Sequence, residues 1–60
     1  MNHSIYDIIR MMELYGGGFI KQLALLWQHA DMDNKKRIEI SFADYFKKYD
    51  DMLRIKEEKR

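Results

Sequence analysis

The chain has 60 residues, of which 47% are hydrophobic and 35% are charged, and its formal net charge is +1. This length allows a single domain, residues 1–60, in which folding hides only about 60% of the surface exposed by the unfolded chain. The sequence contains no cysteine, which excludes disulfides and thiolate metal sites. The near-neutral charge provides no overall field that would favour nucleic acid or an anionic membrane.

The first predicted helix covers about residues 4–15. Ser4 and Asp7 have the S-x-x-D spacing of a helix start at which two residues cap each other's backbone. Apolar residues then recur at helical spacing, which predicts one buried face. Gly16, the first of three consecutive glycines, is expected to end this helix in the left-handed conformation.

The second predicted helix, about residues 19–30, contains the only tryptophan and the most apolar run of the chain. Its predicted inward stripe is formed by Phe19, Leu23, Leu26 and Ala30, with Ile20 and Trp27 widening it on one side. If the indole of Trp27 is fully buried, its removal should cost about 3–5 kcal/mol of stability. This segment is therefore predicted to be the central helix of the domain.

A short third helix is predicted for about residues 34–40, after Asp31 and Asp33, either of which is a suitable helix cap. Its apolar residues Ile38 and Ile40 are two positions apart, so an extended conformation is the alternative for this segment. A helix or a 3₁₀ turn is preferred because a single strand would have no partner strand in this chain.

The fourth predicted helix covers about residues 42–57 and has the most regular apolar stripe. Ser41 and Asp44 repeat the S-x-x-D spacing of a helix start. Residues 56–60 contain no apolar anchor and are expected to fray.

These elements predict an all-α protein, a small bundle of three to four short helices. The predicted core consists of Ile9, Met12, Phe19, Leu23, Leu26, Trp27, Phe42, Phe46, Tyr49 and Leu53. Three apolar residues lie off the inward faces and are interface candidates, namely Met11, Leu14 and Leu25. Because so small a core leaves a monomer marginally stable, we expect self-association, most simply as a symmetric dimer.

No group of residues indicates catalysis or a metal site, so neither an enzyme nor a cofactor is expected. Both serines are explained as caps, and no nucleophile with an adjacent base is apparent. The segment 31–34 resembles the beginning of a calcium-binding loop, but Lys35 and Lys36 occupy the next ligand position and the glycine position. His29 and Asp31 lack a third ligand at a suitable spacing.

One candidate binding site lies at the glycines. Gly17, Gly18 and Lys21 place free amides and an ammonium group at a helix start, which is a generic site for an anion such as a nucleotide. The simpler interpretation is that the glycines only form a turn.

The second candidate is the basic cluster Lys35, Lys36 and Arg37. Its position at the start of a helix after a turn is similar to that of a DNA-recognition helix. The turn glycine typical of that motif is absent, and a solvated basic face is the simpler interpretation.

No segment approaches the ~20 apolar residues that a membrane-spanning helix needs. The first residues also lack the basic start and apolar stretch of a secretory signal. We therefore expect a soluble, cytoplasmic protein.

A broader pattern in the sequence consists of Gly17-Gly18-Phe19, Leu23, Trp27, Ala30-Asp31, Asn34, Phe42 and Tyr49. It resembles small uncharacterised proteins that are common in phage and prophage genomes, over roughly residues 16–49. In those proteins a proline often follows the phenylalanine that corresponds to Phe42, whereas this chain has Ala43. The resemblance implies no activity and no catalytic residues. It implies a virus-encoded accessory protein that acts on a host component by binding.

The sequence thus favours a small helical protein-interaction module that binds or inhibits a protein partner. One alternative is a protein that sequesters a small anionic ligand such as a nucleotide. A less favoured alternative is a nucleic-acid-binding module.

Overall fold

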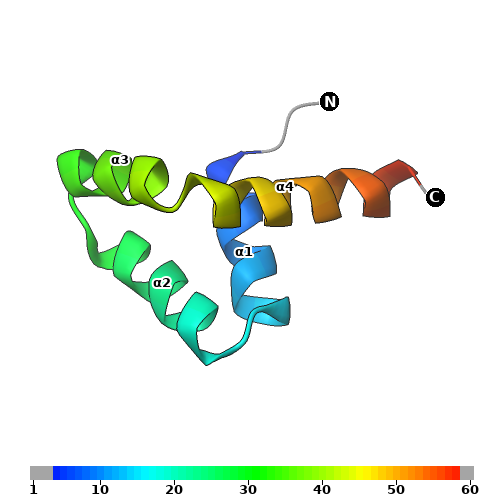
Figure 1. The fold of residues 1–60 in the computed structure, drawn as a ribbon, viewed down its shortest axis with the longest axis horizontal. Helices are drawn as coiled ribbons and strands as arrows, with labels where there is room; N and C mark the ends of the chain where they lie inside the picture. The colour runs from blue at the N-terminus through cyan, green and yellow to red at the C-terminus, as the bar shows by residue number, and fades with distance from the viewer. Residues whose placement is uncertain (1–3, 59–60) are drawn as a thin grey trace.

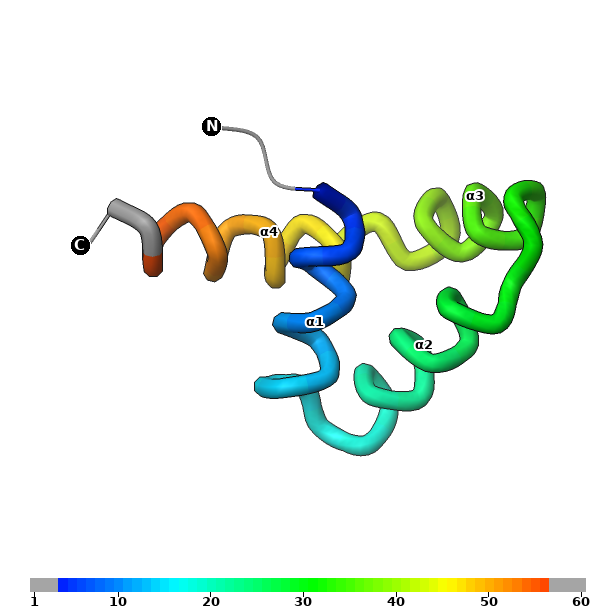
Figure 2. The backbone as a smooth tube through the Cα atoms, turned by 180° about the vertical axis from the view of Figure 1, so that it is seen from behind, coloured from blue at the N-terminus to red at the C-terminus, as the bar shows by residue number. Residues whose placement is uncertain are grey.

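The computed structural model describes residues 4–58, whose backbone forms four α-helices. These are α1 (Ile5–Tyr15), α2 (Gly18–His29), α3 (Met32–Ser41) and α4 (Ala43–Glu58). α3 and α4 follow one another along the long axis of the molecule, and α1 and α2 lie to one side of them (Figure 1). α1 packs against α2 and α4, while α2 also packs against α3 (Figure 2). The prediction of an all-α bundle is confirmed.

Two helices begin with the caps that the sequence predicts. At α1, Ser4 Oγ accepts a hydrogen bond of 3.3 Å from the backbone N–H of Asp7, and Asp7 Oδ2 accepts one of 3.3 Å from the backbone N–H of Ser4. At α3, Asp31 Oδ1 accepts a hydrogen bond of 2.9 Å from the backbone N–H of Asn34. These bonds satisfy N–H groups that have no partner within a helix, so both starts are fixed locally.

Between α3 and α4 the helical path is interrupted only by Phe42, whose φ of −119° and ψ of 34° depart from helical values. Ser41 is the last residue of α3, so the prediction that Ser41 opens the fourth helix was wrong. The extended alternative for the third segment was also wrong. Ile38 is buried while Ile40 is 78% exposed, because residues two apart on a helix point about 200° away from each other.

The last helix, α4, continues to Glu58. The sequence led us to expect fraying from Lys56 onward, so the helix extends past that point; residues 59 and 60 lie outside the described part.

On the exposed side of α4, Asp51 accepts hydrogen bonds of 2.7 Å from Arg54 and 3.0 Å from Lys47. These two bonds, that from Arg54 first, hold the pKa of the Asp51 carboxyl below its ordinary value. Because the group is exposed, we expect it to contribute little to stability.

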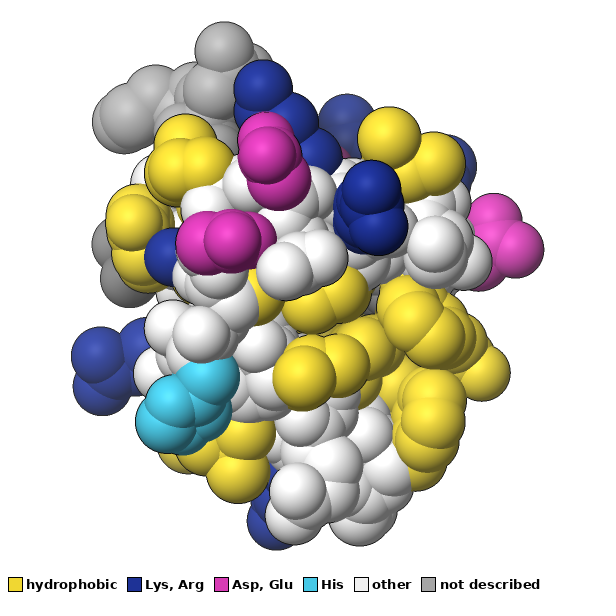
Figure 3. Space-filling model, turned by 90° about the vertical axis from the view of Figure 1, so that its left-hand side faces the viewer, with side chains coloured by type: hydrophobic (Ala, Val, Ile, Leu, Met, Phe, Trp, Pro, Cys, Tyr) yellow, Lys and Arg dark blue, Asp and Glu magenta, His cyan; other side chains and the backbone are white. Residues whose placement is uncertain are grey.

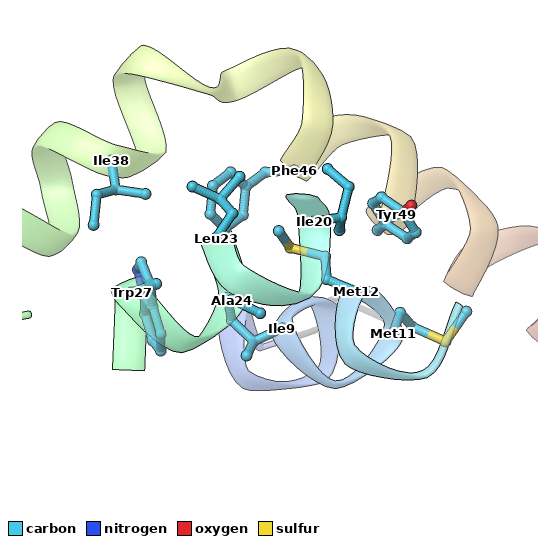
Figure 4. Close-up of a cluster of buried hydrophobic side chains, with 10 residues drawn as sticks. All are labelled: Ile9, Met11, Met12, Ile20, Leu23, Ala24, Trp27, Ile38, Phe46 and Tyr49. Atoms are coloured by element: carbon cyan, nitrogen blue, oxygen red, sulfur yellow. The ribbon is translucent and has the colours of Figure 1, made fainter. Parts of the chain in front are cut away.

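The core lies where the helices meet, and every fully buried side chain of the described residues is apolar or aromatic. It comprises Ile9, Met11, Met12, Ile20, Leu23, Ala24, Trp27, Ile38, Phe46 and Tyr49 (Figure 4). Six residues of the predicted core are therefore confirmed, and Phe42 and Leu53 are half-buried against it. Met12, with no exposed surface, lies at the centre of the cluster.

α2 presents a different face to the core from the one predicted. The prediction that Phe19 and Leu26 are core residues was wrong, since they are 59% and 56% exposed. The buried residues of α2 are instead Ile20, Leu23, Ala24 and Trp27. On this face the small Ala24 has no exposed surface, and the bulky indole of Trp27 lies where three helices meet.

α1 contacts two helices, and its buried face is wider than a single stripe. Met11 was predicted to be surplus to the core, but it is only 6% exposed, so that prediction was wrong. With Met52 and Ile55 it lines a shallow hollow beside α4. Leu14 and Leu25 are exposed, as predicted for interface candidates.

Gly16 is required by close packing rather than by backbone conformation. Its φ of −77° and ψ of 155° are extended, so the prediction of a left-handed glycine was wrong. A Cβ atom at this position would lie closer than 3.0 Å to Ile20 Cγ2 and to the backbone oxygen of Met12. The direct turn from α1 into α2 therefore depends on the absence of a side chain here.

Gly16→Ala should lower the free energy of unfolding by about 1–3 kcal/mol, because the added methyl group overpacks the junction of α1 and α2. Gly18→Ala is the matched control, since nothing lies within 4 Å of a Cβ there and the residue opens α2. The control should be neutral or slightly stabilising. Urea denaturation of both variants measures the difference, and equal stabilities would contradict the packing role of Gly16.

Trp27 joins three helices. Its ring lies edge-on to Tyr6 of α1 at a centroid distance of 5.5 Å. Its indole Nε1 donates a hydrogen bond of 2.8 Å to Glu39 Oε2 of α3, and the Nζ atom of Lys35 lies 4.5 Å from the ring centroid. The side chain is only 2% exposed.

Trp27→Ala should therefore destabilise the fold by about 3–5 kcal/mol. Trp27→Phe retains an aromatic ring but removes the donor to Glu39, and its stability should fall between those of the wild type and the alanine variant. Thermal and urea unfolding followed by circular dichroism measure both effects. A loss below about 1 kcal/mol for the alanine variant is outside the range for a buried tryptophan and would show that the indole is exposed.

Candidate interaction surface

Three aromatic rings pack together on the surface where α2 meets the junction of α3 and α4. The ring centroids of Phe19 and Tyr45 are 5.7 Å apart, those of Phe19 and Phe42 6.2 Å, and those of Phe42 and Tyr45 6.1 Å. Phe42 is half-buried, whereas Phe19 and Tyr45 are exposed. Leu26 lies seven residues, about two helical turns, after Phe19 on the same face of α2. We refer to Phe19, Leu26, Phe42 and Tyr45 as the aromatic patch.

A hollow of about 360 Å³ adjoins the aromatic patch between α2 and α3. Leu26 belongs to both, and the hollow is otherwise lined by His29, Ala30, Asn34, Arg37 and Ile38. Figure 3 shows hydrophobic side chains gathered over this end of the molecule. Contiguous exposed apolar surface of this kind marks interaction sites more often than scattered apolar residues do.

The charges beside this surface are not balanced. α2 contains no acidic residue, and its ionisable side chains are Lys21 and His29. Arg37 of α3 adds a guanidinium group at the hollow. The α2–α3 side of the aromatic patch is therefore neutral to basic.

The predicted anion site at Gly17, Gly18 and Lys21 lies at the exposed N-terminus of α2. Gly17 is the N-cap of α2 and has no side chain to cap the helix, and no acidic residue lies in the first turn. Nothing lies within 4 Å of the Cβ positions of Gly17 and Gly18. Lys21 is exposed in the same turn, so these residues form an open surface rather than an enclosed pocket.

The predicted basic cluster on α3 is divided between different faces, because consecutive helical residues point about 100° apart. Lys35 is half-buried and lies over the ring of Trp27. Arg37 lines the hollow beside Leu26, and Lys36 is exposed. The three side chains therefore do not form a single basic surface.

A second, larger hollow of about 690 Å³ lies between α1, α2 and α3. Its lining is Tyr6, Ile9, Arg10, Glu13, Leu14, Trp27, Gln28 and Lys35. We refer to it as the α1–α3 groove. Sequence reasoning did not identify Tyr6, Arg10 or Glu13 as site residues, because the groove exists only through the relative placement of helices far apart in the chain.

Among the side chains that the structure describes, no three His, Asp or Glu residues lie close enough together to hold a metal ion. No helix in the described part of the chain is both long and apolar enough to cross a bilayer.

Comparisons with protein-family models, with curated proteins and with solved structures found no match to this chain. Its function is therefore inferred from the geometry of its own surfaces.

Proposed function

We propose that this chain is a small helical protein-binding module that contacts its partner through the aromatic patch. The observation that carries the proposal is the exposure of Phe19, Leu26 and Tyr45 beside the half-buried Phe42. Aromatic residues are enriched in the energetic centres of protein interfaces because each buries a large area. Other residues of α2 and α4 form the core, so the exposed side chains of the aromatic patch are available to a second molecule.

The geometry of the aromatic patch favours binding at low entropic cost. Phe19 contacts both Phe42 and Tyr45, so each ring is already positioned by its neighbours. Phe19, Leu26 and Tyr45 project from helices, and Phe42 is the single residue between α3 and α4. Groups positioned before binding lose less conformational freedom when the complex forms.

The adjoining hollow indicates the chemistry of the partner. Its apolar wall of Leu26 and Ile38 can receive an apolar side chain, and Arg37 and His29 lie beside that wall. The complementary ligand is an amphipathic helix with an apolar face and an acidic residue at its edge. A virus-encoded accessory protein that inhibits a host protein by occupying such a helix would need only this surface.

The aromatic patch gives more support to protein binding than to the two alternative functions. The nucleotide hypothesis has only the open helix start at Gly17 and Gly18, with Lys21 exposed nearby. The nucleic-acid hypothesis requires a continuous basic surface, but Lys35 and Arg37 line different hollows.

Replacing Phe19 and Tyr45 with serine should abolish partner binding, and because the two residues are 59% and 39% exposed, circular dichroism should show the double variant still folded. The test is affinity capture from a bacterial lysate with the wild type, the double variant and the control Ile40→Ser. Ile40 is 78% exposed but belongs neither to the aromatic patch nor to the lining of either hollow. A partner should be retained by the wild type and the control and lost by the double variant. The isolated partner must then bind the wild type in a purified pair. Retention by the double variant would contradict the proposal.

A second copy of the chain is a further occupant for the aromatic patch, and we propose that two copies pair through it in the absence of another partner. Sedimentation equilibrium should show a dimer of the wild type and a monomer of the Phe19→Ser/Tyr45→Ser variant. The melting temperature of the wild type should rise with protein concentration. A wild type of one chain mass with a concentration-independent melting temperature would exclude the dimer while leaving binding to another protein testable.

A further inference from the structure

The α1–α3 groove presents one side of α1 along its length. Tyr6, Arg10, Glu13 and Leu14 line it, and their spacing places them on one side of the helix. From Tyr6 to Leu14 this side extends about 12 Å, at about 1.5 Å per residue. The opposite wall comes from α2 and α3. The groove thus has the length of two helical turns.

The carboxylates in and beside the groove already have partners. Glu13 Oε2 accepts a hydrogen bond of 3.1 Å from Gln28 Nε2 across the groove, from α2 to α1. Glu39 Oε2 accepts the indole N–H of Trp27 at 2.8 Å. These two hydrogen bonds link neighbouring helices.

The cations of the groove lack acidic partners within the described residues. Arg10 forms no ion pair or hydrogen bond with another described side chain, and Lys35 has only the face of Trp27. An Arg guanidinium offers five N–H donors and a Lys ammonium offers three. Anionic oxygen atoms of a ligand would complement these donors.

The groove also offers apolar contact beside these cations. Its floor is formed by the buried Ile9 and Trp27. Tyr6 is 66% exposed and its ring packs against the indole at an interplanar angle of 78°, and Leu14 is exposed at the other end. A carboxylate next to an apolar or aromatic side chain would match both properties.

We propose that the α1–α3 groove binds an acidic peptide segment of a protein, with a carboxylate on Arg10 and Lys35 and an apolar side chain against Tyr6 or Leu14. This site goes beyond the proposed function because none of its residues belongs to the aromatic patch or to the hollow that adjoins the patch. A peptide is favoured over an enclosed small molecule because the groove is open to solvent along two turns of α1. Nucleic acid is disfavoured because Arg10 and Lys35 are the two cations of the groove, whereas Arg37 lines a different hollow, so no continuous basic surface is available for a run of phosphates.

The test is selection of peptides from a displayed random dodecapeptide library on the full chain. Enriched peptides should contain Asp or Glu next to an aromatic or aliphatic residue. A synthetic copy of the strongest peptide should bind Arg10→Met and Lys35→Met at least about tenfold more weakly, the consequence of losing one charge-assisted hydrogen bond. Methionine keeps the apolar stem that covers the groove. The affinity of the synthetic peptide for the wild type should also fall as salt is added.

Lys36→Met is the matched control, because Lys36 carries the same charge on the same helix but is exposed outside the groove. It should bind the peptide as the wild type does, and circular dichroism should show all three variants folded. Enrichment of peptides without acidic residues, equal affinities for all variants, or no enrichment would overturn the proposal. So would adenosine monophosphate binding that depends on Arg10 in the absence of peptide binding.

The Phe19→Ser/Tyr45→Ser variant separates this proposal from the proposed function. It should bind the acidic peptide normally, since neither residue lines the groove. Loss of the peptide in this variant alone would place the peptide on the aromatic patch and overturn the groove proposal. If Arg10→Met and Lys35→Met change no binding, the groove proposal fails. The partner-capture result for the aromatic patch would still stand.

Discussion

Burial of the Trp27 indole at the meeting point of three helices is the constraint on which the rest of the structure depends. The indole is held by Tyr6 of α1 and by Glu39 of α3, so it fixes α2 between its two neighbours. Once Trp27 points inward, helical periodicity also places Ile20 and Leu23 in the core. The hydrogen bond to Glu39 adds direction to this apolar contact, because the indole N–H needs an acceptor when it is buried.

The orientation of α2 that buries Trp27 also creates both surfaces to which we assign binding. With Trp27 inside, Phe19 and Leu26 lie on the outer side of α2, where Phe19 meets the ring of Tyr45. On the other side of the helix, the indole forms the floor beneath Lys35. One surface is thus apolar, and the other carries the two cations Arg10 and Lys35 beside apolar side chains. A chain of 60 residues can therefore present two chemically different surfaces around a single core.

Local features of the fold could be predicted from the sequence because they depend on neighbouring residues. The Ser4–Asp7 cap and the Asp31 cap are short-range hydrogen bonds, and both are present. The face that α2 buries could not be predicted, because apolar residues cover more than half of its circumference. Only the packing of the helices on one another buries Ile20 and leaves Phe19 exposed. A short side chain at Ala24 is a signal for close helix packing that would have favoured the correct face.

The candidate site was less predictable than the fold. Phe42 and Tyr45 fall on one apolar stripe of the sequence, but their contact with Phe19 joins residues more than 20 positions apart. The α1–α3 groove joins Arg10 to Lys35 although α1 and α3 do not pack directly against each other. The basic run 35–37 suggested one charged surface, yet helical geometry turns its members in different directions. Sites of this kind require the placement of whole helices.

The most direct test of this account is the exposure of individual side chains in solution, measured by nuclear magnetic resonance with a soluble paramagnetic reagent. Exposed protons relax faster in its presence, whereas protons in the core are protected. At a concentration where the chain is monomeric, we expect strong relaxation enhancement for the side chains of Phe19 and Leu26 and protection of those of Ile20 and Trp27. Protection of Phe19 and Leu26 together with enhancement at Ile20 and Trp27 would contradict the orientation of α2, and with it both proposed surfaces.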